Sequence, residues 1–156
     1  MRTSSVLVLL CLIGCGGNPP SPSDTGSAPD PDAPEKVTLY SIDPNDNAKQ
    51  QEESFRGRPV LGKVEIQTPA QRKELVAALK DGIARRPEHY AKCFEPRHGL
   101  RIVDKDKMTE YVICFSCSNY SEHSDDGGKG LQAINSDVRP TFDKPLQDAG
   151  VPLAPK

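Results

Sequence analysis

Apolar and polar positions divide this chain of 156 residues into three unlike parts. Residues 6–13 form one short, uninterrupted apolar run near the N-terminus. Residues 16–35 contain six prolines and almost no apolar side chain. From residue 36 onward, short apolar stretches alternate with polar ones, which is the pattern of a folded domain. The chain is therefore predicted to hold a signal segment over 1–14, a linker over 15–35 and one domain over 36–156.

The first part is typical of an export signal. Arg2 supplies a positive charge, the apolar run follows, and the small residue Gly14 ends it. The run is too short to cross the ~30 Å of hydrocarbon in a bilayer as a helix. Residues 1–14 are therefore predicted to be a signal peptide that is removed on export.

Residues Leu12-Ile13-Gly14-Cys15 resemble the lipobox of bacterial lipoproteins. The resemblance implies that the thiol of Cys15 receives a diacylglycerol, that the peptide before it is cut away, and that the new amino group is acylated. Two or three acyl chains anchor a protein stably in a membrane, whereas one holds it only marginally. Lipoproteins that are retained in the inner membrane usually have aspartate directly after the acylated cysteine. This chain has Gly16 at that position, so the resemblance favours the outer membrane. The alternative is an ordinary signal peptide cut after another small residue.

The linker has a composition that favours an extended, disordered tether, because its few apolar side chains cannot offset the entropy lost on ordering. Its charged side chains are all acidic: Asp24, Asp30, Asp32 and Glu35. Removing these four and the basic Arg2 from the totals of 22 acidic and 20 basic residues leaves 18 acidic and 19 basic in the domain. A nearly neutral domain, in a chain of net charge -2, argues against a nucleic-acid partner.

Within the domain, the spacing of apolar residues predicts strands and one strong helix. Residues 37–42 and 62–67 are predicted to be strands, and the second shows strict alternation of apolar and polar side chains. A helix is predicted over residues 69–86, because Thr68 and Gln71 have the spacing of a capping box and the apolar residues that follow share one face. Helix and strands along one chain favour an α+β domain.

The rest of the domain is predicted to add a hairpin and a short helix. Residues 100–103 and 111–115 favour two strands that turn near Asp106, and residues 118–128 are interpreted as a loop. A short helix before Gly150 is expected to be capped by Asp137, and it contains Phe142, Leu146 and Ala149 at helical spacing. The predicted fold class is thus α+β, a small antiparallel sheet with one main covering helix, preceded by a signal peptide and a disordered tether.

The predicted hairpin brings three cysteines and a histidine together. If the turn is centred near Asp106, residues that face each other have numbers that sum to about 212. His98 then lies opposite Cys114, and Cys117 lies close to Cys93. This register predicts a cluster of four side chains at the open end of the hairpin.

The cluster allows three interpretations. A disulfide between Cys93 and Cys117, with Cys114 as a buried free thiol, suits an oxidising compartment and closes a loop that contributes about 3 kcal/mol. Alternatively, Cys93, His98, Cys114 and Cys117 form the chemical set of a Cys₃His zinc site. That set requires the chain to turn after Cys114, because positions three apart on a strand point to opposite faces. The third interpretation is a reactive thiol paired with His98.

No motif in the sequence predicts a catalytic residue, and no cofactor is predicted apart from the alternative of zinc at the cysteine cluster. Residues 93–99 together with 113–117 are similar to a motif of uncharacterised bacterial lipoproteins, and this resemblance implies no activity. The predicted function is therefore that of a lipid-anchored cell-envelope protein with a small, non-enzymatic structural or interaction domain. Its expected partners are the membrane, through the acyl chains, and an envelope protein. The alternative is an envelope protein that depends on zinc or on its thiols.

Overall fold

A computed structural model describes residues 30–45 and 53–155 of the chain. The predicted signal peptide, Cys15 and most of the predicted tether lie outside these residues. The described strands are β1 (Lys36–Ile42), β2 (Ser54–Phe55), β3 (Arg58–Glu65), β4 (His98–Asp104), β5 (Lys107–Cys114), β6 (Asn119–Ser124) and β7 (Gly127–Ala133). The helices are α1 (Pro69–Ala84) and α2 (Arg139–Asp148), with short 3₁₀ turns η1 (Phe115–Cys117) and η2 (Ser136–Val138).

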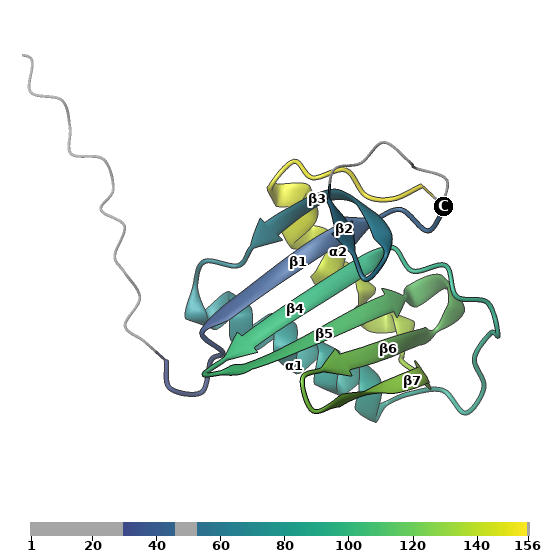
Figure 1. The fold of residues 1–156 in the computed structure, drawn as a ribbon, viewed down its shortest axis with the longest axis horizontal. Helices are drawn as coiled ribbons and strands as arrows, with labels where there is room; N and C mark the ends of the chain where they lie inside the picture. The colour runs from purple at the N-terminus through teal and green to yellow at the C-terminus, as the bar shows by residue number, and fades with distance from the viewer. Residues whose placement is uncertain (1–29, 46–52, 156) are drawn as a thin grey trace, which may run out of the picture.

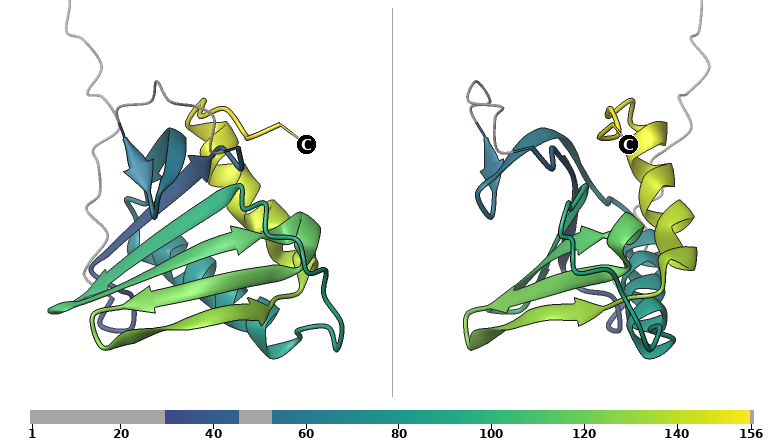
Figure 2. Two further views of the ribbon diagram at one scale, coloured as in Figure 1. Left: turned by 45° about the vertical axis from the view of Figure 1, so that its right-hand side comes forward. Right: turned by 90° about the vertical axis from the view of Figure 1, so that its right-hand side faces the viewer.

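The strands form one seven-stranded sheet in the order β2-β3-β1-β4-β5-β6-β7 (Figure 1). Every pairing between neighbouring strands is antiparallel, and β4 to β7 follow one another as a meander. Both helices lie on the same side of the sheet, as the side view shows (Figure 2). The prediction of an α+β fold with an antiparallel sheet and one main helix is confirmed, although the sheet is larger than expected.

Helix α1 begins where the sequence predicts. The Thr68 hydroxyl accepts a hydrogen bond from the backbone N–H of Gln71 at 3.2 Å and donates one to the Gln71 side chain at 3.0 Å. Pro69 occupies the first turn, where its missing N–H costs nothing. The helix ends at Ala84, two residues earlier than predicted, and the exposed Asp81 and Arg85 side chains form an ion pair one turn apart.

The main core lies between the helices and the sheet. It is made of buried side chains from the sheet and from both helices, among them Val37, Leu39, Leu100 and Ile113 from the sheet, Leu75 and Leu79 from α1, and Phe142 and Leu146 from α2. Burial of such side chains is worth roughly 1.5–3 kcal/mol each. This contact therefore fixes how both helices lie on the sheet.

A second, smaller core covers the other face of the sheet. The β2–β3 hairpin folds over this face, and the ring of Phe55 stacks on Tyr40 with centroids 4.5 Å apart. The buried carboxylate of Glu110 forms ion pairs with Arg56 of the hairpin turn and with Arg101 of β4. The hairpin is thus held to the sheet by both an aromatic contact and a buried charge.

Two sequence predictions are wrong in this part of the chain. Residues 118–128, interpreted as a loop, form β6, a two-residue turn and the start of β7. Asp137 does not cap α2, because it belongs to η2, where its N–H donates to the side chain of Asn135 at 2.9 Å. Gly150 does end the helix, and its φ of 69° is the left-handed conformation that favours glycine there.

The last residues assigned to the tether lie against α1. Arg72 Nε donates to the carbonyl oxygen of Pro34 at 2.8 Å, and the Lys73 ammonium lies 3.4 Å from the Asp30 carboxylate. Among the described residues, no helix is both long enough and apolar enough to span a membrane.

Candidate functional site

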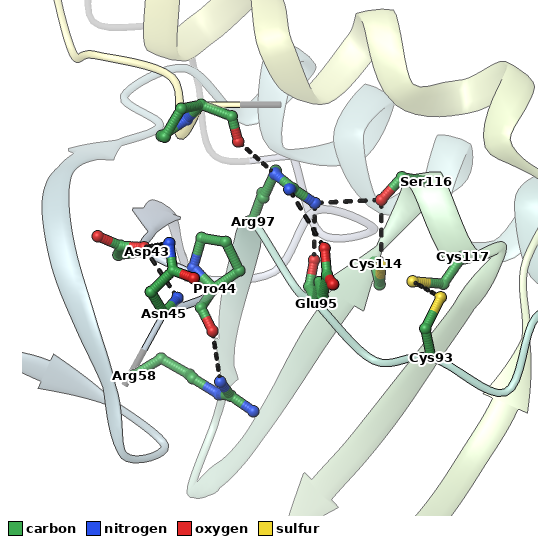
Figure 3. Close-up of polar contacts among 11 residues, drawn as sticks. Asp43, Pro44, Asn45, Arg58, Cys93, Glu95, Arg97, Cys114, Ser116 and Cys117 are labelled. Atoms are coloured by element: carbon green, nitrogen blue, oxygen red, sulfur yellow. Dashed lines mark hydrogen bonds and ion pairs between the residues drawn. The ribbon is translucent and has the colours of Figure 1, made fainter. Parts of the chain in front are cut away.

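Three cysteines gather where β5 ends (Figure 3). Cys114 is the last residue of β5, Cys117 lies in η1, and Cys93 comes from the segment before β4. The Sγ atoms of Cys93 and Cys117 are 2.7 Å apart. All three are free thiols in this structure, with Cys93 exposed and the other two buried. The structure thus brings the expected disulfide pair together, and the covalent bond itself stays a prediction.

A buried asparagine holds the segment that carries Cys93. The fully buried Asn119 donates from Nδ2 to the carbonyl oxygens of Ala91 at 2.9 Å and Cys93 at 2.8 Å. The N–H of Ala91 donates in turn to the carbonyl of Cys117 at 3.2 Å. The role of Asn119 was not expected, because its sequence neighbours are polar and suggested a loop.

Contacts among the sulfur atoms make the three thiols unequal. The hydrogen bond with Cys117, followed by desolvation, raises the pKa of Cys93 to about 11. Burial, followed by contact with Cys117, raises the pKa of Cys114. Burial also acts to raise the pKa of Cys117, but the hydrogen bonds from Cys114 and Cys93 hold it below the ordinary thiol value. Cys117 is therefore the thiol that ionises first, and the thiolate is the reactive form in disulfide chemistry.

The structure separates His98 from the cysteines and corrects the predicted register. His98 lies opposite Ile113 rather than Cys114, so the numbers of paired residues sum to 211 rather than about 212. Because side chains alternate along a strand, Cys114 and His98 point to opposite faces of the sheet. In the part of the chain that the structure describes, no three histidine, cysteine or carboxylate side chains form a group that could hold a metal ion. His98 therefore does not join the three cysteines at the end of β5.

His98 instead forms a buried pair with α2. Its Nε2 lies 2.7 Å from Oδ1 of Asp143, whose other oxygen accepts from Arg139 Nε at 3.0 Å. The imidazole packs edge-on against the rings of Phe115 and Phe142. Burial acts to raise the pKa of Asp143, but the hydrogen bond with His98 and the charges of His98 and Arg139 hold it below its usual range. The pair fastens β4 to α2.

A groove opens between β3, α1 and α2 on the side of the sheet that carries the helices. Its volume of about 350 Å³ falls within the range of small-molecule sites. Val64, Ile66 and Leu75 supply apolar surface from the sheet and α1, while Pro145 and Ala149 supply it from α2. The groove can therefore take an apolar group of several carbon atoms out of water.

The side of the groove formed by α2 includes a row of short side chains. Thr141, Pro145 and Ala149 follow one another at intervals of four and so share one face of the helix. A row of short residues at this spacing can be recognised in the sequence. The local sequence does not indicate whether that row faces a second helix or solvent.

Comparison with known proteins gives no match to a family model, to a curated protein or to a solved structure. The function of the chain must therefore be inferred from its own residues. The described part of the chain carries a cysteine cluster at the end of β5 and a groove between the helices.

Proposed function

We propose that this chain is a lipid-anchored protein of the bacterial cell envelope whose domain binds a small apolar molecule without transforming it. The lipobox-like residues 12–15 support the anchor, which would place the domain at the outer membrane. The groove supports the binding role, and it is the observation that carries the proposal. An apolar site of about 350 Å³ is suited to hold a ligand, because burying apolar surface is favourable wherever the shapes fit.

The cysteine cluster and the His98–Asp143 pair lie outside this groove. None of the three cysteines lines it, and neither His98 nor Asp143 does. The sulfur cluster instead connects the segment before β4 to the end of β5, where a disulfide would stabilise the fold. The thiols therefore support a structural role, and the groove supports binding.

A neutral probe tests the proposal on the mature, acylated protein in phospholipid nanodiscs. 1-Adamantanol is compact, uncharged and soluble enough to be titrated. We expect it to shift the methyl NMR signals of Val64 and Leu75 in a saturable way, while methyl groups on the other face of the sheet, such as those of Val112, stay in place. Nanodiscs without protein give the correction for partition into lipid.

Two matched variants locate the binding. Ala149→Trp fills the groove and should abolish the shifts. Ala77→Trp adds the same ring to an exposed position of α1 that does not line the groove, and it should leave binding unchanged. The proposal is wrong if no methyl signal responds, or if Ala149→Trp binds the probe as well as the parent protein does.

A further inference from the structure

The charges around the groove are not balanced. Three carboxylates and one ammonium group line it, from Glu65, Glu74, Asp148 and Lys144. Glu65 is paired with Lys36 at 2.9 Å, and Asp148 is paired with Lys144 at 2.7 Å. Glu74 forms no ion pair or hydrogen bond through its side chain with any other described residue. One negative charge at the groove is therefore left without a partner in this part of the chain.

A proline interrupts the regular hydrogen bonding of α2 beside the groove. Pro145 lies inside the helix and has no N–H, so it cannot donate to the carbonyl oxygen of Thr141 one turn earlier. Both residues line the groove. A carbonyl that lacks its usual helical donor is stabilised by a donor from elsewhere. The groove thus combines apolar walls with the unpaired carboxylate of Glu74, and its one ammonium group, from Lys144, is already engaged by Asp148.

We infer that the groove binds an amphiphilic cation, a molecule with a compact apolar body and a protonated amine. The apolar body lies against Val64, Leu75 and Pro145, and the amine donates to the carboxylate of Glu74. This inference rests on the proposed binding function and names the ligand class. An anionic ligand of the same shape is disfavoured, because it would bring a second negative charge to Glu74.

The chain's own linker is a poor occupant of this groove. Residues 16–29 contain one charged side chain, the acidic Asp24, and one aliphatic side chain, Ala28. Such a segment offers neither a cation for Glu74 nor an apolar group large enough to fill the space. An external ligand matches the groove better than this segment does.

Three probes of equal shape test the inference, again with the acylated protein in nanodiscs. 1-Adamantylamine, 1-adamantanol and adamantane-1-carboxylate share the same apolar cage, and at neutral pH they are positive, uncharged and negative, respectively. We expect the amine to bind about three- to fivefold more tightly than the alcohol, as for an ion pair near the surface, and the carboxylate to bind most weakly. Raising the salt concentration should reduce the preference for the amine and leave the alcohol unaffected.

Glu74→Gln should remove the preference for the amine, so that the amine and the alcohol bind this variant about equally. Glu88→Gln is the matched control, because Glu88 is exposed and does not line the groove. If the amine and the alcohol bind equally to the parent protein, the inference is wrong while the binding function stands. If no probe binds, both fail. If the probes bind only after residues 16–29 are deleted, the groove holds the linker and the inference is wrong.

Discussion

Cys93 and Cys117 lie 24 positions apart in the sequence, and their sulfur atoms are 2.7 Å apart in the fold. Asn119 brings them together by binding the backbone on both sides of Lys92. Cys117 has the lowered thiol pKa of the cluster, so its thiolate can attack an oxidised partner such as an envelope disulfide oxidase. The thiol of Cys93 would then displace that partner and complete the bond.

We predict that the exported protein contains a Cys93–Cys117 disulfide. On the chain-entropy model a loop of this length contributes about 3 kcal/mol, so Cys93→Ser and Cys117→Ser should each lower the melting temperature by about 10 °C. The double variant should lose little more than either single variant. Thermal unfolding followed by circular dichroism measures these differences.

Cys114→Ala is the control for this prediction, because it removes a buried thiol that is outside the pair. It should cost only a packing contribution of about 1 kcal/mol. Peptide mapping without reduction identifies the bond directly. A Cys93–Cys114 linkage, or three free thiols in the exported protein, would contradict the prediction.

Local sequence patterns predicted the parts of the fold that are defined locally. Residues 69–86 carried both a cap and an apolar face, and residues 37–42 and 111–115 were strongly apolar, so α1, β1 and β5 were found. Strands β6 and β7 were missed because most of their side chains are exposed or half-buried and need no apolar alternation. The two aspartates followed by Gly127 were the available hairpin signal there.

The candidate sites depended on relationships that no local pattern contains. The register of the β4–β5 hairpin differed by one from the expected register, because the turn is centred between Lys105 and Asp106. In the observed register, His98 therefore lies on the opposite face of the sheet from Cys114. It contacts Asp143, which is 45 positions away in the sequence. The groove likewise depends on the distance between two helices that are far apart in the sequence. Such distances follow from the packing of the whole core.

Gly99 provides a test of the second core. A Cβ atom at this position would lie 2.6 Å from Cδ1 and 2.7 Å from Cε1 of the buried ring of Phe55. We predict that Gly99→Ala forces the β2–β3 hairpin away from the sheet and destabilises the protein by about 1–3 kcal/mol. Urea unfolding measures the loss.

Two companion variants separate this clash from a general effect of replacing glycine. Gly130→Ala should be nearly neutral, because nothing apart from its own chain neighbours lies within 4 Å of the added Cβ. Phe55→Leu makes room, so combining it with Gly99→Ala should cost less than the sum of the two single changes. Strict additivity would show that Phe55 does not cover Gly99 in solution.

The lipobox-like residues predict that the mature chain begins at Cys15 and carries acyl chains. The mass of the intact exported protein should equal residues 15–156 plus lipid, and the protein should fractionate with the membrane. Cys15→Ser should leave the precursor uncut by lipoprotein signal peptidase and without lipid. Cys11→Ser is the control and should be processed normally. A mature protein without lipid, free in the periplasm, would contradict the anchor and leave the groove proposal untouched.

Asp143 predicts a specific dependence of stability on pH. Its carboxylate accepts from His98 at 2.7 Å and from Arg139 at 3.0 Å, and its pKa in the folded protein lies below the ordinary value of 3.8. The unfolded chain therefore binds a proton more readily than the folded one. The stabilisation is fully present above pH 3.8 and is lost as the pH falls through the lower, folded value.

Asp143→Asn should accordingly reduce the free energy of unfolding at pH 7 by about 1–3 kcal/mol, the cost of losing charge-assisted hydrogen bonds at a largely buried site. The difference between the parent protein and this variant should shrink as the pH is lowered below 3.8. Asp148→Asn breaks an exposed ion pair with Lys144 on the same helix and should cost at most a few tenths of a kcal/mol at either pH. Urea unfolding at several pH values measures both. Equal losses for the two variants would mean that the His98–Asp143 contact does not hold β4 to α2.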